Sequence, residues 1–293
     1  MLPDIQRRIV NAKYVLERAA KIQSESNEMS LSISLLLMHD AIELLMLAVL
    51  DHLRLTPKKR REFMDFWSDI QQSGRPEPPD FIPMESLNKL RVGLKHNGNL
   101  PNPQTVRDLL PRAKGFFENV LRAYCDTSYD DISLIDLIPH AGIRAVLAES
   151  RREFLVGSKV ESLIKLKIAL HGLENPEGKV LPLLQAPPKP SLPSELQRAG
   201  LGQYLDSLHS FLEQCAIRTN ANLLGIDPFR YTRFMRMTPS LQWSMAGTYQ
   251  AQLRGTYDEV TKDIYDEFID FLVDYSLKVS EVYIPKTIRV TLP

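Results

Sequence analysis

Residues 35–50 read Leu-Leu-Leu-Met-His-Asp-Ala-Ile-Glu-Leu-Leu-Met-Leu-Ala-Val-Leu and form the most apolar stretch of the chain. A membrane span needs about 20 apolar residues, and this shorter run is interrupted by His39, Asp40 and Glu43. A helix built from it is apolar on most of its surface, as expected for a helix buried on nearly all sides. We therefore predict that a helix over residues 30–53 forms the centre of a soluble helical domain.

The segments that flank this helix also repeat apolar residues at helical spacing. Further helices are predicted over residues 4–25, 84–95 and 105–124, with another that begins at Pro57. His96-Asn97-Gly98 provides a stop for the helix over residues 84–95, because glycine readily adopts the left-handed backbone that ends many helices. These five helices predict a compact domain over residues 1–127.

The second half, residues 128–293, is predicted to be a helical accessory domain. Its helices are expected over residues 138–154, 159–173, 194–224, 228–237 and 257–282. Six prolines in residues 175–193 indicate a linker or surface excursion. Residues 283–292 alternate apolar and polar side chains and predict at most a short terminal strand. The predicted fold class is therefore all-α.

Composition excludes several classes of function. The 36 basic residues balance the 36 acidic ones, which argues against a general polyanion binder. Two cysteines, Cys125 and Cys215, are too few for a disulfide framework or a cysteine-rich zinc site. The N-terminus lacks the apolar segment of a signal peptide, so a cytoplasmic protein is expected. No nucleotide-binding glycine loop or zinc-protease motif is present, and neither a metal nor a cofactor is predicted.

One segment suggests chemistry, at the end of the helix predicted over residues 84–95. Residues 86–98 read Ser-Leu-Asn-Lys-Leu-Arg-Val-Gly-Leu-Lys-His-Asn-Gly and contain Arg91 and His96 in an Arg-x4-His pattern. A histidine moves protons near neutral pH, and a guanidinium stabilises charge on a phosphate. This spacing alone is common in proteins, so a functional interpretation of it depends on the helices around it.

That context resembles the HEPN superfamily (higher eukaryotes and prokaryotes nucleotide-binding domains) over about residues 4–124. Residues 34–45 look like the second helix of that family, and residues 90–98 look like its functional signature. The resemblance implies a metal-independent endoribonuclease in which Arg91 and His96 are catalytic. The ribose 2′-OH attacks the adjacent phosphate and leaves a 2′,3′-cyclic phosphate and a 5′-OH. It also implies a toxin or antiviral-defence role, with an antitoxin or sensor protein as a partner.

The geometry of a helix restricts how this pair acts. Five residues of regular helix rotate by about 140°, so the side chains of Arg91 and His96 point apart. They converge only if the chain bends after Gly93 or near Gly98, or if a second copy contributes. The resemblance implies the second solution, a homodimer with the active site at its interface.

Four further residues are candidates for binding the substrate: Lys95, Asn97, His39 and Glu43. Lys95 follows Arg91 by one turn and suits a phosphate contact, whereas Asn97 precedes a glycine and also fits an ordinary turn. His39 and Glu43 lie four residues apart and share a helix face. They are expected either to line the cleft and orient His96 or to form a satisfied buried polar pair.

Alternative interpretations remain open at this point. Arg91 also suits an ion pair with a carboxylate, and His96 suits a helix C-terminus, where a positive charge is favourable. Val92 stands where active members of the family often have a polar residue. This departure favours a catalytically inactive module that binds a protein partner or a nucleotide. A plain helical scaffold is a third interpretation.

Overall fold

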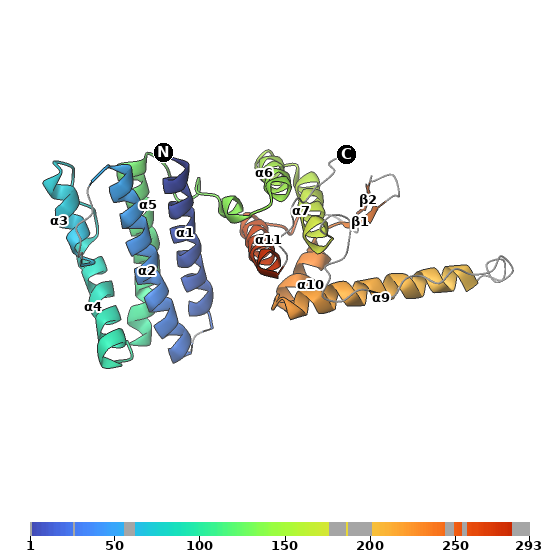
Figure 1. The fold of residues 1–293 in the computed structure, drawn as a ribbon, viewed down its shortest axis with the longest axis horizontal. Helices are drawn as coiled ribbons and strands as arrows, with labels where there is room; N and C mark the ends of the chain where they lie inside the picture. Colours follow the sequence, from blue (N-terminus) through green and yellow to red (C-terminus); the bar gives the residue numbers. More distant parts are fainter. Residues whose placement is uncertain are drawn as a thin grey trace. The chain divides into compact units, whose positions relative to one another are not determined.

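A computed structural model describes residues 2–25, 27–55, 62–175, 186, 201–243, 249–253 and 257–282. Most of these residues are helical, which confirms the predicted all-α class (Figure 1). The chain divides into two compact units, Met1–Leu137 and Ile138–Pro293. The first unit therefore ends after Leu137 rather than at residue 127, where the sequence predicted the boundary.

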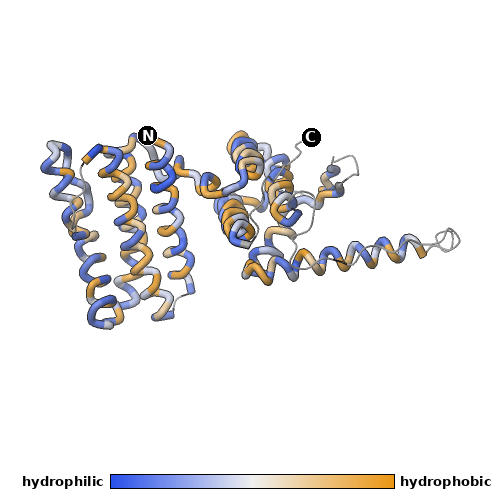
Figure 2. Tube along the Cα trace, in the orientation of Figure 1, coloured by the Kyte–Doolittle hydropathy of each residue, from blue (hydrophilic) through white to orange (hydrophobic). Residues whose placement is uncertain are grey.

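Unit 1 is a bundle built around the predicted central helix. Its elements are α1 (Pro3–Gln23), α2 (Glu28–His52), α3 (Asp65–Gln72), α4 (Phe81–Asn97), α5 (Pro103–Cys125) and the short 3-10 helix η1 (Leu134–Leu137). Helix α2 packs against α1, α4 and α5, and Figure 2 shows its predominantly apolar course through the bundle. Many of its apolar side chains, among them Leu35, Ile42 and Leu45, are fully buried.

Helix α2 is the one described helix whose length and composition alone suit a membrane span. Of its most apolar 18-residue window, 61% is buried inside the structure. The apolar surface of α2 is thus largely covered by its neighbours in unit 1, as predicted for a central helix.

Local sequence signals account for the ends of these helices. The Asn27 side chain accepts a hydrogen bond from the Ser30 N–H at 2.8 Å, and Asn102 caps α5 in the same manner. These contacts satisfy backbone donors that have no partner within the helix. Helix α3 begins at Asp65 rather than at Pro57, and residues 56–61 lie outside the described residues.

The segment after α5 explains why unit 1 extends to Leu137. The Lys13 ammonium donates to the backbone carbonyl oxygens of Tyr129 and Ile132 at 2.7 and 2.8 Å. The Tyr129 hydroxyl bonds to Glu17 of α1 at 2.5 Å. The apolar side chains of Ile132, Leu134 and Ile135 are buried. Residues 128–137 therefore belong to the core of the first unit, because α1 holds them by both polar and apolar contacts.

Unit 2 is also helical. Its described elements are α6 (Ala141–Leu155), α7 (Lys159–Glu174), α9 (Leu201–Leu223), α10 (Pro228–Met237), β1 (Ser240–Trp243), β2 (Tyr249–Gln252) and α11 (Lys262–Val282). Helices α6 and α7, which match the helices predicted over residues 138–154 and 159–173, are joined by a turn at Gly157 with φ +88°. Aromatic side chains of α10 and α11 form much of the core, with the rings of Phe234 and Phe268 5.1 Å apart.

Strand structure differs from the prediction. Strands β1 and β2 pair as an antiparallel hairpin, from Ser240 opposite Gln252 to Trp243 opposite Tyr249. This hairpin was not predicted from the sequence. The strand predicted over residues 283–292 lies outside the described residues, as does the proline-rich segment apart from residues 175 and 186.

Candidate functional site

Helix α4 carries both predicted catalytic residues and does not bend between them. It is continuous from Phe81 to Asn97, so the bend considered after Gly93 does not form. It ends at Gly98, whose φ is +67° and whose N–H bonds to the Leu94 carbonyl oxygen at 3.1 Å. Arg91 and His96 therefore leave the same helix about 140° apart. Within one chain, the structure places them on one helix but not in one site.

Arg91 lies on the side of α4 that faces α2. Leu87 and Met84, which are one and two turns before it on that side, are fully buried. Arg91 itself is half-buried. Burial lowers the pKa of His39 on α2, and the positive charge of Arg91 lowers it further. The guanidinium thus lies close enough to α2 to affect a buried histidine there.

His39 is the centre of a polar group on α2 that also includes Asp40 and Glu43. It is 2% exposed, and its ring stacks on Phe63 with the centroids 4.2 Å apart. Its Nε2 lies 3.3 Å from Asn88 Oδ1 of α4. Its Nδ1 lies 3.6 Å from an Asp40 carboxylate oxygen and 3.9 Å from one of Glu43. We refer to His39, Asp40, Glu43, Asn88 and Arg91 as the α2–α4 polar cluster.

The cluster contains two residues that the sequence analysis missed. Asp40 was noted only as an interruption of the apolar run, and Asn88 was not singled out. A signal for Asn88 was available, because it precedes Arg91 by three residues and so shares its side of α4. Its partner His39 is 49 residues away in sequence, and this contact follows only from the packing of α4 on α2.

His96 lies on the other side of α4, in solvent. It is exposed, as are Val92, one turn before it, and the neighbouring Lys95 and Asn97. Among the residues that the structure describes, no hydrogen bond joins His39 or Glu43 to His96. The predicted substrate-binding set is therefore divided: His39 and Glu43 lie near Arg91, while Lys95 and Asn97 lie beside His96 at the end of the helix.

The alternative explanations for Arg91 and His96 find little support in the geometry. No described carboxylate lies within 4.0 Å of the Arg91 guanidinium, whereas its neighbour Lys89 pairs with Glu85 at 3.0 Å. The carbonyl oxygens of Gly93 and Leu94 are bonded by the N–H groups of Asn99 and Gly98. His96 has no hydrogen bond to them, although its place in the last turn suits a positive charge.

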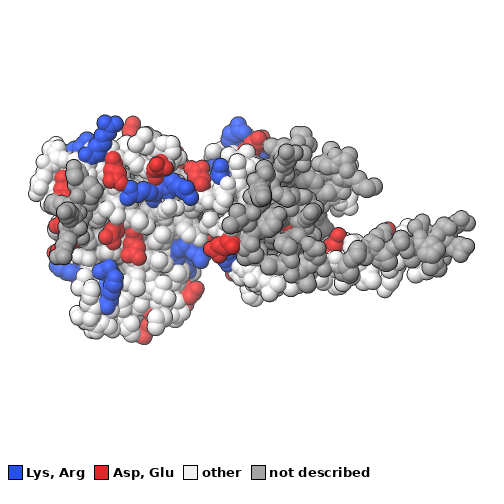
Figure 3. Space-filling model, viewed as in Figure 1, with Lys and Arg blue, Asp and Glu red and all other residues white. Residues whose placement is uncertain are grey.

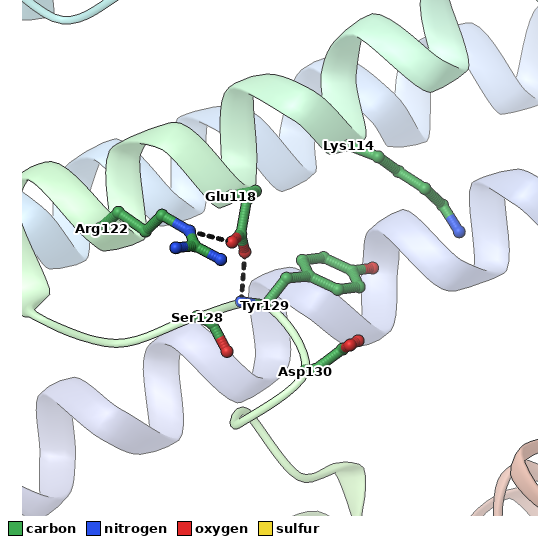
Figure 4. A pocket seen from close by; sticks show the side chains of 6 residues that line it. All are labelled: Lys114, Glu118, Arg122, Ser128, Tyr129 and Asp130. Atoms are coloured by element: carbon green, nitrogen blue, oxygen red, sulfur yellow. Dashed lines mark hydrogen bonds and ion pairs between the residues drawn. The ribbon is translucent and has the colours of Figure 1, made fainter.

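A depression of about 250 Å³ lies elsewhere in unit 1, and three of its lining residues are joined by hydrogen bonds (Figure 4). It is lined by Lys114, Glu118, Arg122, Ser128, Tyr129 and Asp130. Glu118 accepts hydrogen bonds from Arg122 and from the Tyr129 N–H. Lys114 pairs with Glu17 at 3.1 Å. These contacts attach residues 128–130 to the bundle. We assign no ligand to the depression.

The described surface of unit 1 that Figure 3 presents mixes basic and acidic side chains. This mixture agrees with the net charge of zero. On this face a polyanion would therefore meet a few local cations rather than an extended basic patch.

Comparisons of the chain with protein-family models, with curated proteins and with solved structures find no match. Its function has to be inferred from the residues and geometry of α2 and α4.

Proposed function

We propose that unit 1 is a HEPN-type endoribonuclease domain that cleaves RNA without a metal ion through Arg91 and His96. The observation that supports this proposal most is the partial burial of Arg91 without a described carboxylate partner. Its guanidinium is half-buried at the α2–α4 contact and has no described carboxylate partner. A partly desolvated charge without a counter-ion costs folding free energy, so a role in binding an anion gives a reason for its presence.

In the proposed reaction His96 transfers protons and Arg91 binds the phosphate. His96 takes the proton of the ribose 2′-OH as that oxygen attacks the adjacent phosphorus, or returns a proton to the leaving 5′-oxygen. Arg91 donates hydrogen bonds to the phosphate oxygens as negative charge accumulates on them. The P–O5′ bond breaks as the new P–O2′ bond forms, which gives a 2′,3′-cyclic phosphate and a 5′-OH.

The continuous helix supports a homodimeric active site. Because Arg91 and His96 point apart on α4, we place Arg91 of one chain beside the histidine of a second copy. Val92 is 39% exposed, and no atom lies within 4 Å of a Cβ added at Gly93. This side of α4 therefore has room for a second helix. Lys95 and Asn97 would contact the RNA backbone there, and His39 and Glu43 would line the side next to Arg91.

The biological role that fits this activity is a cytoplasmic toxin or antiviral-defence protein. Free ribonuclease activity harms the cell that makes it, so we propose an antitoxin or sensor protein as its partner. Unit 2 would then serve in partner docking or substrate selection.

The test compares wild type with Arg91→Ala and His96→Ala on mixed RNA in EDTA. Lys89→Ala is the matched control, because Lys89 is an exposed cation on the same helix. We expect wild type and Lys89→Ala to cleave and both other variants to lose roughly 100-fold or more of the rate. Cleavage that persists in His96→Ala would contradict the proposal.

A second candidate is a catalytically inactive module of the same type, and Val92 beside Arg91 is the observation that favours it. A folded wild-type protein that leaves RNA intact but retains a specific protein or nucleotide ligand would select this candidate over the first.

A further inference from the structure

Three potential metal ligands gather on one side of α2. They are His39 Nδ1, a carboxylate oxygen of Asp40 and a carboxylate oxygen of Glu43, and all three atoms lie within 4.8 Å of one another. His39 and Glu43 are one helical turn apart, and Asp40 follows His39 directly, so α2 alone sets their spacing. Imidazole together with carboxylates is a donor set that suits divalent transition metals.

The imidazole of His39 gives a second, independent indication of a ligand. Its side chain is 3% exposed, and its Nδ1 is buried without a hydrogen-bond partner. The Asn88 amide oxygen lies 3.3 Å from Nε2 and so favours the tautomer with the proton on Nε2. That tautomer directs the lone pair of Nδ1 toward two carboxylates, an arrangement that a cation between them would stabilise.

We propose that His39, Asp40 and Glu43 bind a divalent transition metal such as Zn²⁺, with water completing its coordination. In a tetrahedral zinc site with bonds of about 2.1 Å, ligand atoms lie roughly 3.4 Å apart. The Nδ1 atom is 3.6 Å from Asp40 and 3.9 Å from Glu43. The side chains of Asp40 and Glu43 are 56% and 43% exposed, so small rotations bring them to bonding distance.

The surroundings of the three ligands suit a cation. The two carboxylates contribute −2 and the nearby Arg91 contributes +1, which leaves a net charge of −1 for the cluster. Among the described residues, neither Asp40 nor Glu43 forms an ion pair with a lysine or arginine. Asn88 lies at hydrogen-bonding distance from Nε2, the ring nitrogen that does not face the carboxylates. Most metal-binding histidines have such a hydrogen-bonding partner on the ring nitrogen that does not bind the metal.

This site goes beyond the proposed RNA cleavage, which uses no metal. Its test is therefore a binding measurement on the full chain. After EDTA treatment and removal of the chelator, Zn²⁺ is titrated calorimetrically, and Co²⁺ is titrated by its visible absorption. We expect one ion per chain, and a Co²⁺ spectrum that reports a nitrogen-and-oxygen ligand set.

Glu43→Gln and Asp40→Asn are the decisive variants, because both replace exposed side chains and leave the buried His39 in place. We expect each to weaken Zn²⁺ binding roughly tenfold or more. Glu85→Gln, which replaces a half-buried carboxylate on α4, is the matched control and should bind as wild type does. Zn²⁺ should also raise the melting temperature of wild type and of Glu85→Gln by more than that of Glu43→Gln.

The proposal is overturned if wild type binds no Zn²⁺ or if Glu43→Gln and Asp40→Asn bind it as tightly as wild type. Neither result depends on RNA cleavage. Failure of the metal site and failure of the ribonuclease proposal are therefore distinguishable.

Discussion

Arg91 and His96 lie five residues apart on one uninterrupted helix and leave it on different sides, about 140° apart. Arg91 faces α2 and the buried His39, whereas His96 is exposed at the end of α4. A regular helix thus separates the two groups that the proposed chemistry needs together. This relationship makes a site shared by two chains the simplest way to use both residues on one phosphate.

The end of α4 depends on Gly98. Its φ of +67° disfavours any residue with a Cβ, so Gly98→Ala should cost about 1–2 kcal/mol of folding free energy. The change should also loosen the turn that carries His96 and Asn97. Denaturant unfolding, followed by the fluorescence of Trp67 in a Trp243→Phe background, measures the effect on unit 1.

Gly93 is the matched control on the same helix, because a Cβ added there meets no atom within 4 Å. Gly93→Ala should stabilise α4 by about 0.5–1 kcal/mol. Equal effects of the two substitutions would contradict the assignment of Gly98 as the helix stop.

Residues 128–137 are predicted to be part of the folding unit that contains α1. A fragment of residues 1–137 should melt cooperatively, whereas residues 1–127 should melt at a distinctly lower temperature. The shorter fragment loses three buried side chains, Ile132, Leu134 and Ile135, each worth about 1.5–3 kcal/mol. Scanning calorimetry of the two fragments tests this, and equal melting temperatures would place the boundary at residue 127.

The stability of unit 2 should depend on Glu174, which is buried at the end of α7. Burial raises its pKa from 4.5 to about 7 and outweighs the hydrogen bond that the Tyr231 hydroxyl donates to its carboxylate at 2.8 Å, which lowers the pKa. The folded state thus favours the protonated carboxyl. The stabilisation is fully present below pH 4.5 and is lost as the pH rises through 7, by up to about 3 kcal/mol.

Glu174→Gln removes this titration while keeping an oxygen that accepts from Tyr231. The free energy of unfolding of wild type should therefore fall relative to that of the variant as the pH is raised from 5 to 8. Glu161→Gln, which replaces an exposed carboxylate on the same helix, should show no such difference from wild type. Thermal melts of the three proteins at both pH values measure the difference. Parallel pH profiles for wild type and Glu174→Gln would show that Glu174 titrates normally.

Much of the helical framework was predictable because its signals are local. Helix α10 spans Pro228–Met237 as predicted, since Asp227 caps it and proline suits its first turn. The turn at Gly98 was also predicted. The hairpin of β1 and β2 was not, because its strands are only four residues long. Such short strands give too few alternations for a period to be recognised.

The candidate site was predictable only in part. The positions of Arg91 and His96 on one helix follow from their spacing, and His39 and Glu43 follow from the interrupted apolar run. The contact of His39 with Asn88 and its stacking on Phe63 depend on how α2, α4 and the turn before α3 pack. Such tertiary contacts leave no periodic signal in the sequence.

We propose that Arg91 of one chain acts with His96 of another. The most direct test of this claim is RNA cleavage in EDTA by heterodimers that are purified through two different affinity tags. A two-fold dimer contains two pairs, each made of Arg91 from one chain and His96 from the other. A heterodimer of Arg91→Ala with His96→Ala keeps one of these pairs intact. It should therefore show roughly half of the wild-type rate, although each variant alone is inactive. The second heterodimer combines wild type with the Arg91→Ala, His96→Ala double variant, and it should be inactive because it keeps only a pair within one chain. The reverse pattern, with the first heterodimer inactive and the second active, would contradict the claim.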